Sequence, residues 1–257
     1  MSVVPAFDEL GQGTVAVLLL HGIGGGKAIW RDSLQALAAA GFRAVALDFP
    51  GYGASPGVAD MDGLVAGVST LVQHLGAARS VLVGHSMGGM VAQEVMAREP
   101  GAVQGLVLAC TSASFGKADG AWQAQFVAER LAPLDAGLGM AGMARMLVPA
   151  LVAAGNTAAQ ETAIALMSRV PENTYRSALR AIAAFDRRDA LARITVPTLC
   201  LAAEHDRTAP PQVMQRLAQR IPGAAYECLR DAGHIANIEQ PAAFNAAVVS
   251  FLQRHFS

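Results

Sequence analysis

The sequence predicts an α/β protein: a doubly wound, mostly parallel sheet with an inserted helical cap. Short apolar runs alternate with longer amphipathic stretches along the 257 residues. Most of the runs are apolar throughout, which is typical of strands covered on both faces. Only residues 114–191 interrupt this alternation, because they carry helical pattern alone. This order of elements favours parallel βαβ units with one helical insertion.

The expected strands are short apolar runs. The first, VAVLLL at 15–20, follows too few residues for an antiparallel hairpin, so at most one strand is expected before it. The other runs lie at 44–47, 81–83, 106–109, 198–202 and 225–229.

The stretches between these runs predict helices. In residues 60–75 the apolar side chains share one face, Asp62 is expected to cap the N-terminus, and Gly76 closes the helix. Pro211 and Pro241 each open a further helix with an apolar stripe.

The helical stretch in the middle of the chain is too long for a loop inside a compact domain. We therefore expect two domains. A core α/β domain consists of residues 1–113 and 192–257, and a helical cap, or lid, is inserted at 114–191.

The composition is apolar, with 53% hydrophobic and 15% charged residues. This excludes disorder, and a net charge of −1 offers no basic surplus for nucleic acid. The window most similar to a membrane span, residues 136–155, contains Arg145, Pro149 and four glycines. Because a span needs about 20 apolar residues, we expect no membrane span and instead a hydrophobic acyl pocket beneath this segment.

The N-terminus lacks the basic and apolar regions of a secretory signal, so a cytoplasmic protein is expected. Three cysteines, Cys110, Cys200 and Cys228, fall in predicted strands without metal-site spacing. Buried free thiols and no metal site are the corresponding expectations.

The strongest motif is G-x-S-x-G at Gly84–Gly88, between the apolar run 81–83 and a helical stretch. A strand, a sharp turn and a helix are the context in which a nucleophilic serine is exposed. A Cβ at either glycine would clash with the neighbouring strand or helix. Ser86 is therefore the predicted nucleophile.

A serine nucleophile needs a base and an orienting acid, which follow it in the order acid, histidine on this type of sheet. His234 lies in the loop after the last predicted strand, where α/β sheets place functional groups. Asp206, which follows the run 198–202, is the expected acid, with Glu204 as the alternative. Two other histidines follow Ser86. His205 is expected to flank the site in the same loop as Asp206, and His255 is expected to be solvated.

The tetrahedral intermediate requires two N–H donors. The backbone N–H groups of Met87 and Ile23 are the expected pair, with Gly24 as the alternative to Ile23 and as a substrate contact. The glycine run HGIGGG at 21–26 lacks the GK[ST] pattern of a phosphate loop, so we expect no nucleotide.

Five ordered blocks carry a family resemblance: LLLHGIGG (18–25), DFPGYGAS (48–55), GHSMGG (84–89), AAEHDRTAP (202–210) and DAGHIANIEQP (231–241). Together they resemble the α/β-hydrolase superfamily over essentially the whole chain. The resemblance implies the α/β-hydrolase fold, with His21 and Asp48 bracing loops beside the site. GHSMGGMVAQ, RITVPTL and GHIANIEQPAAFN resemble the 3-oxoadipate enol-lactonase-like branch, which implies a small carboxylic ester or lactone substrate.

The expected activity is that of a cofactor-free serine esterase or lactonase that forms an acyl-enzyme. Carbon–carbon bond hydrolases and cofactor-free haloperoxidases or perhydrolases use the same triad and stay open, as does a ligand receptor on this fold. Trp122 is a candidate pocket wall or a core residue, and a homo-oligomer is open. The cations that could meet a substrate carboxylate from the insertion are Lys117, Arg130, Arg145, Arg169, Arg176 and Arg180.

Overall fold

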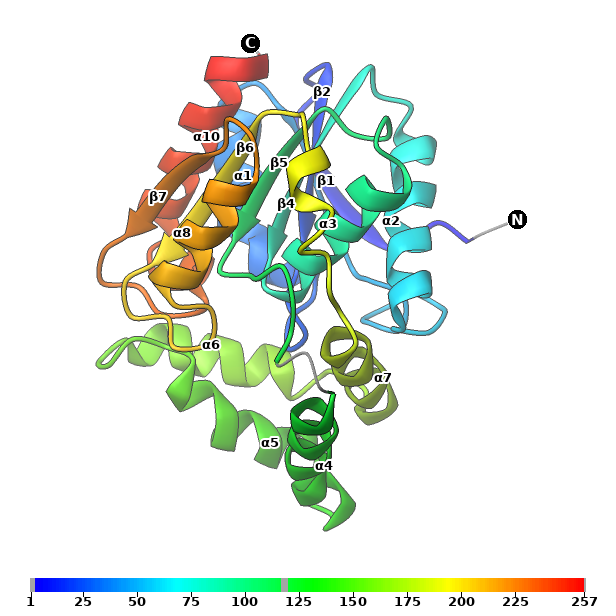
Figure 1. Cartoon of the computed structure of the whole chain (residues 1–257), viewed down its shortest axis with the longest axis vertical. Helices are drawn as coiled ribbons and strands as arrows, with labels where there is room; N and C mark the ends of the chain where they lie inside the picture. Colours follow the sequence, from blue (N-terminus) through cyan, green and yellow to red (C-terminus); the bar gives the residue numbers. More distant parts are fainter. Residues whose placement is uncertain (1–2, 117–119, 257) are drawn as a thin grey trace.

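The computed structural model describes residues 3–116 and 120–256. This part of the chain contains a seven-stranded sheet in the order β1-β3-β2-β4-β5-β6-β7. Figure 1 shows this sheet with helices packed around it. All neighbouring strands are parallel except the edge strand β1 (Phe7–Leu10), which runs antiparallel to β3 (Arg43–Leu47). The prediction of a mostly parallel sheet with one strand before β2 (Val15–Leu20) is confirmed.

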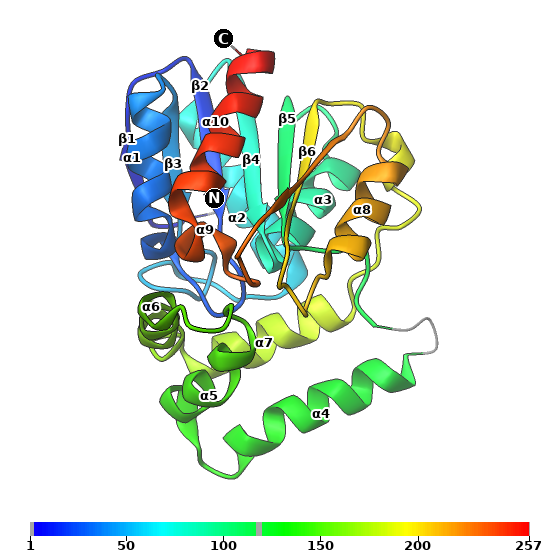
Figure 2. The same cartoon turned by 90° about the vertical axis from the view of Figure 1, so that its left-hand side faces the viewer.

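Helices cover both faces of the sheet, as Figure 2 shows. On one face α1 (Arg31–Ala39) packs against α10 (Pro241–Phe256). The opposite face carries α2 (Met61–Leu75), α3 (Met87–Arg98) and α8 (Pro211–Arg220). Because both faces are covered, the inner strands bury every side chain beyond their first residue. These strands are β2, β3, β4 (Arg79–His85), β5 (Gly105–Ala109) and β6 (Thr198–Ala203).

The last strand departs from this pattern. β7 (Ala225–Leu229) is exposed at all positions but Leu229, because it has a neighbour on one side only. Cys228 is consequently exposed, whereas Cys110 and Cys200 are buried. The expectation that all three thiols are buried is therefore wrong for Cys228.

The helix ends follow local chemistry. The side chain of Asp60 caps α2 by accepting a hydrogen bond from the Gly63 N–H at 2.7 Å. The prediction of Asp62 as the cap is wrong, because Asp62 already lies inside the helix and instead pairs with Arg98. Gly76, with φ of 56°, ends α2 as expected, and Pro211 and Pro241 begin α8 and α10.

Between β5 and β6 the described chain contains helices and loops. The two ends of this segment are joined by an isolated antiparallel β-bridge between Ser114 and Asp186. The helices are α4 (Ala121–Asp135), α5 (Gly139–Leu147), α6 (Thr157–Met167) and α7 (Glu172–Ala183). Figures 1 and 2 show them gathered as a layer beyond the carboxyl ends of the strands. The helical content of this insertion is as expected, while the domain limits 1–113, 114–191 and 192–257 stay a prediction.

The apolar segment 136–155 forms α5 and the short turn after it within this layer. Of the helices in the described residues, none has the length and apolar character that crossing a membrane requires.

Candidate active site

Ser86 occupies the turn between β4 and α3. Its φ of 53° and ψ of −116° are unusual for a residue with a side chain, and such strain is concentrated at functional sites. A Cβ at Gly84 would collide with the carbonyl oxygen of Gly88, and a Cβ at Gly88 would collide with that of Leu20 in β2. The strand and helix therefore approach closely enough to require both glycines of the motif.

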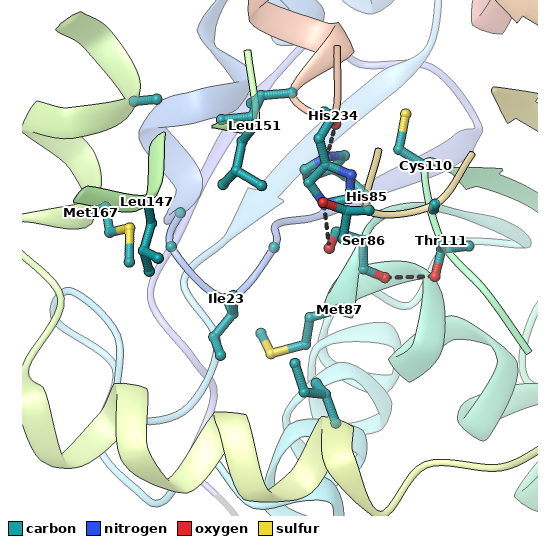
Figure 3. Close-up of a pocket in the computed structure, with 18 of the residues that line it drawn as sticks. Ile23, His85, Ser86, Met87, Cys110, Thr111, Leu147, Leu151, Met167 and His234 are labelled. Atoms are coloured by element: carbon teal, nitrogen blue, oxygen red, sulfur yellow. Dashed lines mark hydrogen bonds between the residues drawn. The ribbon is translucent and has the colours of Figure 1, made fainter. Parts of the chain in front are cut away.

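Ser86, His234 and Asp206 form one chain of hydrogen bonds. His234 Nε2 lies 2.9 Å from Ser86 Oγ, as drawn in Figure 3, and His234 Nδ1 lies 2.9 Å from Asp206 Oδ2. When Nδ1–H donates to the carboxylate, Nε2 is free to accept the serine proton. The three residues follow β4, β7 and β6, so parallel strands bring together side chains that are far apart in sequence.

Asp206 is held as an anion. Its second oxygen, Oδ1, accepts the backbone N–H groups of Thr208 at 2.7 Å and Ala209 at 2.9 Å. Burial by itself would raise the pKa of Asp206, but His234 and these two N–H groups outweigh it and lower the pKa below its usual value. The carboxylate can thus orient His234 and stabilise its cation.

The alternative acid, Glu204, lies elsewhere. It is exposed, and its carboxylate accepts the N–H of Asp231 at 3.1 Å. Glu204, His205 and Asp231 place ligand atoms within 4.8 Å of one another and could hold a metal ion, but all three are exposed and none lines the cavity beside Ser86. His205 therefore flanks the acid loop, and His255, near the end of α10, is exposed as expected.

The two expected oxyanion donors face the same cavity. Ile23 and Met87 both line it, as Figure 3 shows. Within the described chain, neither backbone N–H donates a hydrogen bond. The hydroxyl of buried Tyr52 donates to the Ile23 carbonyl oxygen at 3.0 Å and fixes the orientation of that loop. Both amides are therefore available to an oxygen atom bound beside Ser86.

His21 and Asp48 brace this loop from behind. His21 Nδ1–H donates to the Gly22 carbonyl at 2.8 Å, and its Nε2 accepts the N–H of Phe49 at 3.1 Å. Burial lowers the pKa of His21 to about 4, so the ring is neutral. Asp48 accepts the N–H of Lys27 at 2.7 Å. Neither bonds to Ser86, His234 or Asp206, in agreement with the bracing role that the resemblance implies.

His85, which the sequence analysis did not single out, holds the His234 loop. Its Nε2–H donates to the carbonyl oxygen of His234 at 2.7 Å, also drawn in Figure 3. Burial, with His234 as a second cause, lowers the pKa of His85 to about 3. The motif contains His85 directly before Ser86, but it gives no indication of a hydrogen-bond partner that lies 149 positions away in the sequence.

The cavity above Ser86 has a volume of about 190 Å³ and is enclosed largely by apolar side chains of the insertion. Leu147, Val148 and Leu151, from the segment 136–155, contribute to its wall, which matches the expected apolar pocket beneath that segment. Gly24 also lines the cavity, next to Met167, and its role as a substrate contact stays a prediction. The other insertion residues in the wall include Phe115, Phe126, Ala163, Leu166, Met167 and Leu179.

The structure corrects the position expected for Trp122. This residue is 37% exposed and is not among the residues lining the cavity. Its ring stacks on Phe126, with centroids 5.2 Å apart. The two residues are four apart on the same helix face, but Phe126 lines the cavity whereas Trp122 packs against Phe126.

Among the described residues of the insertion, Arg130 is the cation that reaches the cavity. It lies in the wall, with Cζ 5.1 Å from the centroid of the Phe126 ring, and forms no ion pair among the described residues. Tyr175, 2% exposed, lines the cavity beside it. Arg176 instead pairs with Asp135 and Glu172. Arg145, Arg169 and Arg180 do not line the cavity, and Lys117 is outside the described residues.

Comparison with known proteins agrees with this fold. The sequence profile described as "Alpha/beta hydrolase family" matches residues 17–247. A protein from Variovorax paradoxus named "Putative carbamate hydrolase RutD" is 35% identical over 93% of this chain and 92% of its own. Among solved structures, an esterase from Thermogutta terrifontis has a TM-score of 0.87 at 28% identity, covering 98% of this chain and 94% of that one. The enol-lactonase from Burkholderia xenovorans has a TM-score of 0.85 at 28% identity, covering 96% of each chain.

Proposed function

The chain belongs to the alpha/beta hydrolase family, and from that premise we propose that it is a serine hydrolase that cleaves a small carboxylic ester or lactone through an acyl-enzyme. The observation that carries the proposal is the continuous hydrogen-bond chain from Ser86 Oγ through His234 to Asp206. The apolar cavity of about 190 Å³ next to Ser86 suits a compact acyl group.

In the proposed mechanism Ser86 Oγ attacks the acyl carbonyl while His234 Nε2 takes its proton. The N–H groups of Ile23 and Met87 bind the oxyanion, and Asp206 stabilises the imidazolium. The C–O bond to the leaving group then breaks, and His234 returns the proton to the departing oxygen. A water molecule, deprotonated by His234, attacks the acyl-enzyme, and collapse of the second intermediate releases the acid and restores Ser86.

The insertion acts as the lid of this site in our proposal. The insertion supplies many of the apolar residues of the wall, so it shields the acyl-enzyme from bulk water. The single water molecule that hydrolyses the acyl-enzyme must enter this enclosed site. Arg130 and Tyr175 contribute polar groups to the part of the wall that the insertion supplies. They would meet an anionic or polar group on the part of the substrate farther from the reacting carbonyl.

A carbamate is the second candidate substrate, and the similarity to the Variovorax paradoxus protein named for that activity supports it. Its carbonyl would be attacked by the same groups, because the chemistry differs only in the nitrogen beside the carbonyl carbon. Carbon–carbon bond hydrolysis and cofactor-free haloperoxidase or perhydrolase activity use the same three residues. The non-enzymatic alternative is a ligand receptor with this fold.

The test measures hydrolysis of short-chain p-nitrophenyl esters by the wild type and by Ser86→Ala, with fluorophosphonate labelling of Ser86 followed by mass spectrometry. Hydrolysis and labelling that both vanish in Ser86→Ala support the mechanism, whereas equal rates in the two proteins overturn it. Ligand binding without labelling or turnover would favour the receptor. A panel of enol-lactone, simple lactone, aryl ester, aryl carbamate and vinylogous diketone then ranks the substrate classes.

A further inference from the structure

We propose that Glu239 is a positioning residue that couples the helical insertion to His234. Glu239 ends the short helix α9 (Ala236–Glu239), five positions after the histidine. Its side chain is 6% exposed and does not touch the cavity. The inference rests on the proposed function insofar as His234 is the base, but the physical link between the two segments does not depend on it.

The carboxylate of Glu239 binds the backbone on both sides of His234 and also the insertion. Oε1 accepts the N–H of Ile235 at 3.0 Å, and Oε2 accepts the N–H of Gly233 at 2.9 Å. Oε2 also accepts the N–H of Ala153, from the segment that follows α5, at 2.7 Å. A single buried side chain thus holds three N–H groups of two segments that are about 80 positions apart in sequence.

The two segments also bond to each other directly. The backbone N–H of His234 itself donates to the carbonyl oxygen of Leu151 at 2.7 Å. The approach is so close that a Cβ at Gly233 would lie 2.6 Å from the Ala153 nitrogen and 2.7 Å from the Leu151 oxygen. Leu151 in turn lines the substrate cavity. A shift of this wall is therefore transmitted to the backbone of His234.

The donor set explains why a carboxylate occupies this position. Three N–H groups converge on two oxygens, and an ionised carboxylate accepts at both, whereas an amide accepts at one and donates at the other. Among the described residues Glu239 pairs with no cation, so these N–H groups are what stabilises its charge. The main-chain oxygen of Glu239 is also bound to the insertion, through Asn156 Nδ2 at 3.2 Å.

The experiment compares Glu239→Ala and Glu239→Gln with Glu94→Gln as the matched control. Glu94 is a carboxylate of similar burial that is held by Arg98 and Arg187 and does not line the cavity. One aliquot of each protein is labelled to completion with a fluorophosphonate, which bonds to Ser86 Oγ as fluoride leaves and so counts intact sites. The rate of p-nitrophenyl ester hydrolysis by an unlabelled aliquot is divided by this count to give kcat per intact site.

Glu239→Ala is expected to lower kcat per site by about 100-fold, because small displacements of catalytic groups have effects of that size. Glu239→Gln keeps acceptance at one oxygen and is expected to lose about tenfold. Glu94→Gln should lower the melting temperature without changing kcat per site. A purely structural role for Glu239 would reduce the number of intact sites and leave kcat per site unchanged.

Hydrogen exchange tests the coupling separately. In Glu239→Ala, the amides of segments 150–156 and 232–238 should lose protection together, while Glu94→Gln leaves both protected. Wild-type kcat per site in both Glu239 variants, or loss of protection in one segment alone, overturns the proposal. If Glu239→Ala does not fold, Glu239→Gln carries the same comparison. Failure of the wild type to react with esters or fluorophosphonate would instead overturn the proposed function, and the exchange result would still decide the coupling.

Discussion

Replacing Asp206 with Asn tests the proposed division of labour within the site. The change keeps the shape of a side chain that is 3% exposed and should leave the fold intact. The N–H groups of Thr208 and Ala209 at 2.7 and 2.9 Å would hold the amide oxygen where Oδ1 now lies. The amide nitrogen must then face His234 Nδ1, which lies 2.9 Å from the present Oδ2.

The magnitude follows from the tautomer that this arrangement selects. Because an amide nitrogen donates, Nδ1 must be unprotonated and the ring proton moves to Nε2. Nε2–H then points at Ser86 Oγ, 2.9 Å away, and cannot accept the serine proton. A wrong tautomer of this kind lowers kcat by about 10⁴-fold in serine proteases, which corresponds to about 5.5 kcal/mol of transition-state stabilisation.

The assay measures kcat and KM for a p-nitrophenyl ester in Asp206→Asn and in a control variant, Glu204→Gln. Glu204 is an acid of the same loop that lies outside the cavity. We expect the loss in kcat for Asp206→Asn alone, with KM little changed because Asp206 is not in the cavity wall. Activity within tenfold of the wild type in Asp206→Asn, or a greater loss in Glu204→Gln, would refute the assignment of the acid.

Three further predictions concern stability and specificity. His21 and His85 have folded-state pKa values of about 4 and about 3, against 6.5 when unperturbed. The unfolded chain therefore binds more protons, and the free energy of unfolding should fall with decreasing pH below about 6.5, by up to about 2.7 kcal/mol per pH unit for both rings. Urea unfolding at pH 7, 6 and 5 measures this, and a flat profile would contradict the neutral state of the two rings. Gly88→Ala should prevent soluble folding, because its Cβ collides with the Leu20 carbonyl; a variant with the wild-type melting temperature would disprove that packing. Arg130→Met should raise KM by about tenfold for an ester whose acyl chain ends in a carboxylate, because one charged contact is lost, and should leave KM for the neutral ester unchanged. Arg145→Met, at a residue outside the cavity, is the control. Equal changes in KM for both esters would contradict a role of Arg130 in charge recognition.

The nucleophile turn was predictable from the sequence because its determinants are local. A buried strand, two glycines and a helix within a few residues fix the backbone of Ser86, so the motif and the geometry contain the same information. The parallel strands were also predictable, since burial on both faces leaves an uninterrupted apolar run.

The errors arose where the residue type alone does not decide the outcome. The run at β7 reads like the other strands, and only the strand order places it at an edge with Cys228 exposed. Trp122 and Phe126 share one stripe of α4, so the sequence could not indicate which of the two reaches the cavity. Asp60 and Asp62 are both suitable caps by residue type, and the backbone of Asp60, extended at φ −86° and ψ 169°, makes it the N-cap.

The alignment of His234 depends on more of the fold than its motif suggests. Its carbonyl oxygen is held by His85 of β4, its Nδ1 by the loop after β6, and its N–H by Leu151 of the insertion. Each of these bonds comes from a different element, so both the core and the insertion hold His234 in place beside Ser86. The apolar residues of the segment 136–155 complete that packing and enclose the cavity. In the proposed mechanism the apolar excess of the sequence therefore also limits the access of water to His234, besides stabilising the core.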